Sequence, residues 1–135
     1  MSQPVPTAYD SVIYPGYAYD QTHPDHLATY ARLCGLDPAP VGTCRVLEVG
    51  CGDAANLLPM AETLLESTFH GFDLASSSIE RGRAVARELG LTNLTLDECL
   101  IRHRVAPAIL PRGDIVTVCS AHPCVVWLPC ARPWR

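Results

Sequence analysis

Short β-rich runs alternate with segments of helical apolar spacing through the middle of the chain. An order of strand, helix, strand, helix and strand is typical of a right-handed, doubly wound parallel sheet. We therefore predict an α/β, Rossmann-like fold with about four strands in the order 3-2-1-4, incomplete as a doubly wound sheet and preceded by an N-terminal arm and helix. The predicted strands are 45–49, 68–73, 93–97 and 115–119, and the helices following the first two are 55–65 and 76–89.

Polar and helix-breaking residues mark where the predicted helices begin and end. Thr22 is placed to cap the first helix, with Pro24 in its first turn and Gly35 after its end. The run of three serines at 76–78 offers N-caps to the long helix, which Gly90 closes. These signals predict helices that begin at side-chain caps.

Composition divides the chain into three segments. Residues 1–42 hold a Pro- and Tyr-rich arm and the first helix, and 43–97 hold the well-patterned α/β half. Residues 1–98 contain thirteen acidic and five basic residues, a net charge of −8, whereas 99–135 have a net charge of +4. The segment 98–135 is rich in Cys, Arg, Pro and Trp, and every cation of the chain is Arg. Such a segment is typical of an out-of-frame reading of GC-rich DNA, so we suspect a frameshift or truncation.

Overall composition excludes several classes of protein. Hydrophobic residues make up 48% of the chain, so most of it can build a core. The acidic balance gives no field for nucleic acid, and neither a membrane-spanning run nor a signal peptide is evident. We expect a cytoplasmic protein whose seven cysteines are free thiols. Four residues superficially resemble a zinc set, Cys119, His122, Cys124 and Cys130, but their spacing matches no common finger and we expect no metal.

A glycine turn follows the first strand and carries the main chemical signal. Glycines at 50 and 52 let the backbone turn sharply and approach a ligand closely. Asp73 ends the second strand. It follows Gly52 at the spacing where a carboxylate can bind two ribose hydroxyls. With Ala55, the spacing also satisfies a dinucleotide fingerprint, and the bland alternative is an ordinary strand-to-helix connection.

Glu48 separates two classes of ligand. It stands just before Gly50, at the end of the first strand, where a carboxylate would repel the pyrophosphate of a dinucleotide. S-adenosylmethionine has no phosphate, and its amino and sulfonium groups are cationic, so a carboxylate is favourable there. Glu-x-Gly-x-Gly followed by an Asp at the second strand end resembles the class I methyltransferase site. The alternative for Glu48 is a helix-cap acceptor.

Further motifs extend this resemblance over about residues 9–97. They are Tyr9-Asp10, Tyr14-Pro15-Gly16-Tyr17, Gln21-Thr22-His23-Pro24, 44–52, Asn56-Leu57-Leu58-Pro59-Met60 and Gly71-Phe72-Asp73-Leu74. The segment is similar to bacterial class I methyltransferases that carry a methyltransferase regulatory domain, a group that includes protein-lysine methyltransferases. In that family the arm folds over the cofactor, the glycine loop holds its methionine moiety and the second-strand acid holds its ribose.

The resemblance assigns cofactor-binding roles residue by residue. The residues are Glu48, Gly50, Cys51, Gly52, Asn56, Asp73 and Leu74, with Tyr17, Thr22 and His23 from the arm. Plain structural alternatives remain for several of these: Cys51 as a space-filling side chain, Asn56 as a polar residue of the first helical turn, His23 as a helix cap, and the arm tyrosines as packing against the sheet edge.

The chain departs from the family after Asp97. A stretch at 120–129 only faintly echoes the active-site segment, and nothing corresponds to the remaining strands or the regulatory domain. We expect S-adenosylmethionine binding and methyl transfer to an unidentified acceptor, which the resemblance extends to protein lysine, with this chain alone impaired. Two alternatives stay open: an NAD(P)- or FAD-binding oxidoreductase domain, and a non-enzymatic truncated product that associates through an exposed parallel sheet edge.

Overall fold

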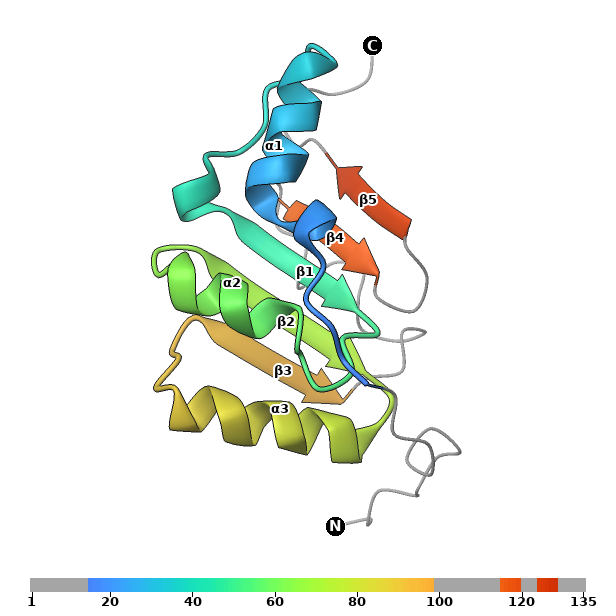
Figure 1. Cartoon of the computed structure of the whole chain (residues 1–135), viewed down its shortest axis with the longest axis vertical. Helices are drawn as coiled ribbons and strands as arrows, with labels where there is room; N and C mark the ends of the chain where they lie inside the picture. The colour runs from blue at the N-terminus through green and yellow to red at the C-terminus, as the bar shows by residue number, and fades with distance from the viewer. Residues whose placement is uncertain (1–14, 99–114, 120–123, 129–135) are drawn as a thin grey trace.

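A computed structural model describes residues 15–98, 115–119 and 124–128, which form one five-stranded sheet with three α-helices (Figure 1). The elements in chain order are the 3-10 turn η2 (Asp20–Thr22), α1 (Pro24–Leu33), the 3-10 turn η3 (Val41–Thr43), β1 (Arg45–Val49), α2 (Leu57–Thr63), β2 (Thr68–Asp73), α3 (Ser76–Glu88), β3 (Leu94–Glu98), β4 (Ile115–Cys119) and β5 (Cys124–Leu128). The α/β, Rossmann-like class is therefore confirmed.

The sheet has the order β3-β2-β1-β4-β5. Strand β1 pairs in parallel with both β2 and β4, and β2 pairs in parallel with β3. The predicted order 3-2-1-4 is confirmed by these pairings. The strand order runs outward from β1 to β3 on one side, and β4 then pairs on the other side of β1. The topological switch point of the sheet therefore lies between β1 and β4.

The fifth strand corrects the prediction of a purely parallel sheet. β5 pairs antiparallel with β4, and Trp127 lies opposite Val116. The run Val125-Val126-Trp127 is thus part of the sheet. A segment of β-branched and aromatic residues favours a strand, and its backbone groups form hydrogen bonds with the neighbouring strand. Strand β5 therefore covers the edge of β4, and the outer strand on this side of the sheet is antiparallel to its neighbour.

One face of the sheet carries the main core. Val46, Phe69 and Leu96, from β1, β2 and β3, belong to one core cluster on the side of the sheet that the helices cover. Figure 1 shows the helices α1, α2 and α3 on this side. Residues of all three helices pack against these strand residues, namely Leu27, Leu57, Met60, Ala61 and Ile79. This packing places the amino ends of α2 and α3 at the carboxyl ends of β1 and β2.

The capping residues predicted for two helices are wrong. The N-cap of α1 is His23, whose Nδ1 accepts a hydrogen bond from the Asp25 amide at 3.2 Å, whereas Thr22 precedes the cap. Helix α3 has Ala75 as its N-cap, a residue whose side chain cannot accept a hydrogen bond. Helix α2 is shorter than the predicted 55–65, because the chain first passes through a turn at 54–56.

None of the helices in the described part of the chain is long and apolar enough to cross a membrane.

Candidate cofactor site at the carboxyl ends of β1 and β2

The turn after β1 is built from left-handed backbone. Gly50 has φ 74° and Gly52 has φ 57°, a region that residues with a Cβ rarely adopt. Ala54 shares this conformation at φ 61°, although its side chain is completely buried. The amides of Gly50 and Cys51 both donate to the Phe72 carbonyl, at 2.7 and 3.0 Å. The turn is therefore held directly against the end of β2.

Asp73 joins the two loops at this end of the sheet. Its Oδ2 accepts the Gly52 amide at 2.8 Å, and its Oδ1 accepts the Ala75 amide at 2.8 Å. A carboxylate has about four lone-pair sites, so roughly two remain for other donors. Among the described residues other than its chain neighbours, no heavy atom lies within 4 Å of the position a Cβ would take at Gly52. The sequence placed Asp73 at the spacing from Gly52 where a carboxylate can bind a ribose, and the structure joins the two residues by a hydrogen bond beside open space at Gly52, with half-buried Leu74 next in the chain.

Asn56 connects the arm to the sheet. Its Oδ1 accepts the Tyr19 amide at 2.8 Å, and its Nδ2 donates to Thr22 Oγ1 at 3.1 Å and to Glu48 Oε1 at 3.2 Å. Thr22 Oγ1 donates in turn to the Tyr19 carbonyl at 2.8 Å. The Asn56 side chain is buried, and its oxygen and both of its N–H groups are used. Asn56 and Thr22, both expected at the cofactor, are thus partners of one another beneath the arm.

Glu48 lies in the interior of the site. Its side chain has no exposed surface, and Oε2 has no hydrogen-bond partner among the described residues. Burial raises the pKa of Glu48 to about 8, with the nearby Asp73 charge adding to the rise and the Asn56 hydrogen bond opposing it. Burial therefore favours the neutral form of Glu48 near pH 7. Its structural partner is Asn56.

Cys51 packs beneath the turn. It is buried, and burial raises the pKa of its thiol, which makes the thiolate scarce. A Cβ at Gly71 would lie 2.7 Å from its Sγ, so the glycine in β2 provides the space that the thiol fills. This environment agrees with the space-filling alternative for Cys51.

The arm crosses directly over the glycine turn. A Cβ at Gly16 would overlap the carboxylate of Asp53 and lie 2.6 Å from Ala55 Cβ. Tyr17, next in the chain, is 59% exposed and is free to contact a ligand, whereas His23 is engaged as the α1 cap. The sequence names Gly16 only as part of a family motif and gives no signal at Ala54, because the contact of the first and the backbone angle of the second exist only in the folded chain.

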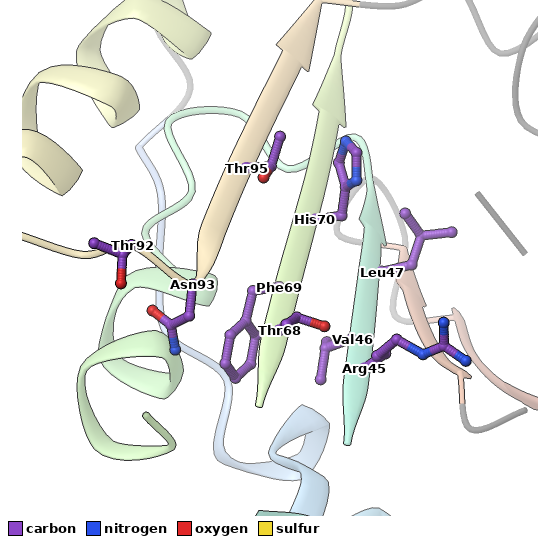
Figure 2. A pocket seen from close by; sticks show the side chains of 9 residues that line it. All are labelled: Arg45, Val46, Leu47, Thr68, Phe69, His70, Thr92, Asn93 and Thr95. Carbon is purple, nitrogen blue, oxygen red and sulfur yellow. The ribbon is translucent and has the colours of Figure 1, made fainter. Parts of the chain in front are cut away.

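Two of the cavities in the described part of the chain differ in their relation to this region. One of about 300 Å³ lies between the arm and α2 and is lined in part by Tyr19, His23, Asn56 and Met60. The other, of about 190 Å³, lies at the opposite end of the sheet, and Figure 2 shows Arg45, Thr68 and Asn93 at the starts of three strands around it. Ligands of open α/β sheets bind at the carboxyl ends of the strands, so the second cavity is not part of the site.

No metal-binding group of three or more His, Cys, Asp or Glu side chains occurs in the part of the chain that the structure describes. The superficial zinc set, with Cys119 and Cys124 on strands and His122 and Cys130 beyond them, involves side chains outside the described residues. Tyr9, Asp10 and Tyr14 of the arm also lie outside them.

Comparison with known proteins agrees with this architecture. A family model described as a methyltransferase domain matches residues 41–116. The Rickettsia prowazekii protein RP028 is 38% identical over 89 residues, which are 66% of this chain and 36% of that protein. The chain therefore spans about a third of the length of this relative.

Solved structures are similar over the same region. PKMT2 from Rickettsia typhi, in complex with AdoHcy, superposes with a TM-score of 0.72 at 33% identity, over 79% of this chain and 20% of that one. An S-adenosylmethionine-dependent methyltransferase from Geobacter sulfurreducens has a TM-score of 0.51 at 20% identity, over 82% of this chain and 40% of that one, which shows a shared fold. Because the family model covers more than half of the residues, the chain belongs to the methyltransferase domain family, with the class I fold.

Proposed function

We propose that this protein binds S-adenosylmethionine at the carboxyl ends of β1 and β2 and transfers its methyl group to an acceptor amine, a protein lysine. The observation that carries the cofactor assignment is the Asp73 carboxylate. It is fixed by the Gly52 and Ala75 amides beside open space at Gly52, and it keeps acceptor capacity for two vicinal hydroxyls.

The residues around the turn bind different parts of the cofactor. The Asp73 carboxylate accepts hydrogen bonds from the ribose hydroxyls of the cofactor. The backbone of Gly50, Cys51 and Gly52 lines the methionine end of the cofactor, where the absence of a Cβ at Gly52 leaves room. Half-buried Leu74 adds apolar surface next to Asp73, and exposed Tyr17 lies on the arm above. The family resemblance implies these roles, and the position of each residue in the folded chain supports them.

Glu48, Asn56 and Thr22 support the site from below. Their hydrogen bonds hold the arm at Tyr19 against the helix that follows the turn, and none of the three side chains is exposed. We assign to them, with the α1 cap His23, the positioning of the arm, which helps to exclude water from the reacting atoms.

Methyl transfer requires mainly that the methyl group and the acceptor atom are aligned. When bound, the cofactor supplies an electrophilic methyl group on a positively charged sulfur. The chain has to hold this group in line with the acceptor nitrogen, and a neutral amine needs no catalytic base. The lysine acceptor is supported by the likeness to PKMT2 and by the resemblance to a group that includes protein-lysine methyltransferases.

Calorimetric titration with S-adenosylhomocysteine tests the cofactor site. Asp73→Ala and Asp73→Asn should weaken binding about 10- to 100-fold, since each removes a charge-assisted acceptor worth roughly 1.5–3 kcal/mol. Asp37→Ala, in an exposed position of the linker before η3, is the matched control and should bind like the wild type. Equal affinity of wild type and Asp73→Ala would contradict the ribose assignment, and binding of NADH without any response to S-adenosylhomocysteine would favour a dinucleotide enzyme.

Methyl transfer to lysine is tested with a tritium-labelled methyl donor. A lysine-rich protein is offered with its amines free or acetylated, at high concentration of the 135-residue chain and over long incubation, because we expect turnover by this chain alone to be slow. Label that enters only the unblocked protein supports the lysine acceptor. Equal labelling of both forms would exclude it.

A further inference from the structure

Gly82 lies in the middle of α3, where helix propensity disfavours it. A glycine in a helix interior costs about 0.5–1 kcal/mol relative to alanine, mainly through backbone entropy. The residue is buried, and it is not among the glycines with positive φ. The helix itself therefore gives no reason for a glycine, and neither the motifs of the sequence nor the proposed cofactor contacts include it.

The reason is a contact with the glycine turn. A Cβ at position 82 would lie 2.6 Å from the backbone oxygen of Asp53 and 3.0 Å from its carbonyl carbon. It would also lie 2.9 Å from Leu96 Cδ1. Leu96 ends in a side chain that can adjust, but the Asp53 carbonyl is backbone and moves only with its turn. The peptide after Asp53 thus rests directly on the backbone of α3.

This peptide belongs to a tightly connected segment. The Ala54 amide donates to the Cys51 carbonyl at 2.9 Å, and the Gly52 amide donates to Asp73 at 2.8 Å. Ala54 has a left-handed φ, so little freedom remains to absorb a displacement of the Asp53 carbonyl. On its outer side the arm presses on Asp53 at Gly16. A side chain at position 82 would therefore shift the backbone that lines the site.

We propose that Gly82 is a positioning residue of the cofactor site, which sets the height of the 52–54 backbone above α3 and with it the Gly52–Asp73 contact. The inference rests on the proposed function of that turn. Gly82 touches no ligand in this account and acts only through Asp53. Its role explains why α3 keeps a residue of nearly the lowest helix propensity at this position.

The experiment compares Gly82→Ala with Gly42→Ala, where the added methyl meets no atom of the described part of the chain within 4 Å apart from its chain neighbours. Gly82→Ala should weaken S-adenosylhomocysteine binding by about tenfold or more, because small misplacements of a binding backbone have large effects. Hydrogen exchange of the Gly52 amide in the ligand-free protein should become faster in the same variant. Gly42→Ala should change neither quantity.

A second variant separates the two contacts of the added methyl. In Gly82→Ala/Leu96→Val the clash with Leu96 Cδ1 is removed and the clash with the Asp53 carbonyl remains. We expect this variant to be folded by circular dichroism and to bind as weakly as Gly82→Ala. Restored affinity would overturn the proposal, because it would assign the effect to packing on Leu96, and an unfolded double variant would overturn it by showing that Gly82 serves folding.

Failure of this inference differs from failure of the proposed function. Wild type that does not bind S-adenosylhomocysteine contradicts the cofactor site, and the Gly52 amide exchange then still decides the role of Gly82. Wild type that binds, with Gly82→Ala retaining the same affinity, overturns the role of Gly82 alone. Unchanged exchange of the Gly52 amide in Gly82→Ala overturns it in either case.

Discussion

Replacing Glu48 by Gln should make the protein more stable at alkaline pH. The carboxyl is completely buried, Oε1 accepts a hydrogen bond from Asn56, and Oε2 has no partner among the described residues. Burial raises its pKa from 4.5 to about 8. Glutamine has nearly the same shape, keeps an acceptor for Asn56 and cannot ionise.

The sign follows from proton linkage. Between pH 4.5 and pH 8 the unfolded chain has lost the proton of Glu48 while the folded chain still holds it. The free energy of unfolding of the wild type therefore falls as pH rises through this window, and the loss is complete above about pH 8. At about 1.4 kcal/mol per pKa unit the full loss is on the order of 3–5 kcal/mol, a large part of a typical total of about 5–15 kcal/mol.

Urea unfolding at acidic, near-neutral and alkaline pH, about pH 5, 6.5 and 8.5, measures this difference. Glu48→Gln and wild type should have similar stability at the acidic end, and the variant should gain several kcal/mol over the wild type at the alkaline end, with unchanged denaturant slopes. Glu62→Gln, on the exposed side of α2, is the control and should follow the wild type throughout. Parallel curves for Glu48→Gln and wild type across this range would refute the assignment of a buried, protonated Glu48.

The remaining predictions concern the two asparagines that link distant segments. Asn56→Ala should release the arm, because the Tyr19 amide loses its acceptor, and faster hydrogen exchange at Tyr19 with little change in the sheet amides would report it. Uniform exchange across the chain would instead indicate global unfolding. Asn93→Ala should lower the free energy of unfolding by about 1–3 kcal/mol. The side-chain amide nitrogen of Asn93 donates to the carbonyls of Ala61, Leu64 and Ser67, in and after α2. Urea titration measures the loss, and an unchanged midpoint would contradict the capping role.

Much of the sheet could be predicted from local pattern. The bounds of β1, β2 and β4 agree with the runs 45–49, 68–73 and 115–119, because buried parallel strands require short apolar stretches between turns. The sequence also placed Asp73 at the end of the second strand, and the structure adds that its carboxylate accepts the Gly52 amide. The antiparallel β5 was missed, because pairing direction depends on where the chain returns.

Side-chain partners could not be predicted in the same way. Thr22 carries a residue type that caps helices, yet its hydroxyl binds the Tyr19 carbonyl and Asn56, and His23 caps α1. Asn56 lies far from Thr22 in the sequence, so no local signal connects them. The choice between competing hydrogen bonds is made by which groups the fold buries together.

The sequence by itself predicted the strand order, the position of the glycine turn and the carboxylate at the end of the second strand, because the alternation of strands and helices and the turn residues between them are local features of the chain. Only the tertiary structure decided the charge state of Glu48 and the need for a glycine at position 82. The first depends on complete burial, which raises the pKa of Glu48 to about 8. The second depends on a backbone contact with Asp53, a residue distant in the chain, where an added Cβ would lie 2.6 Å from the carbonyl oxygen.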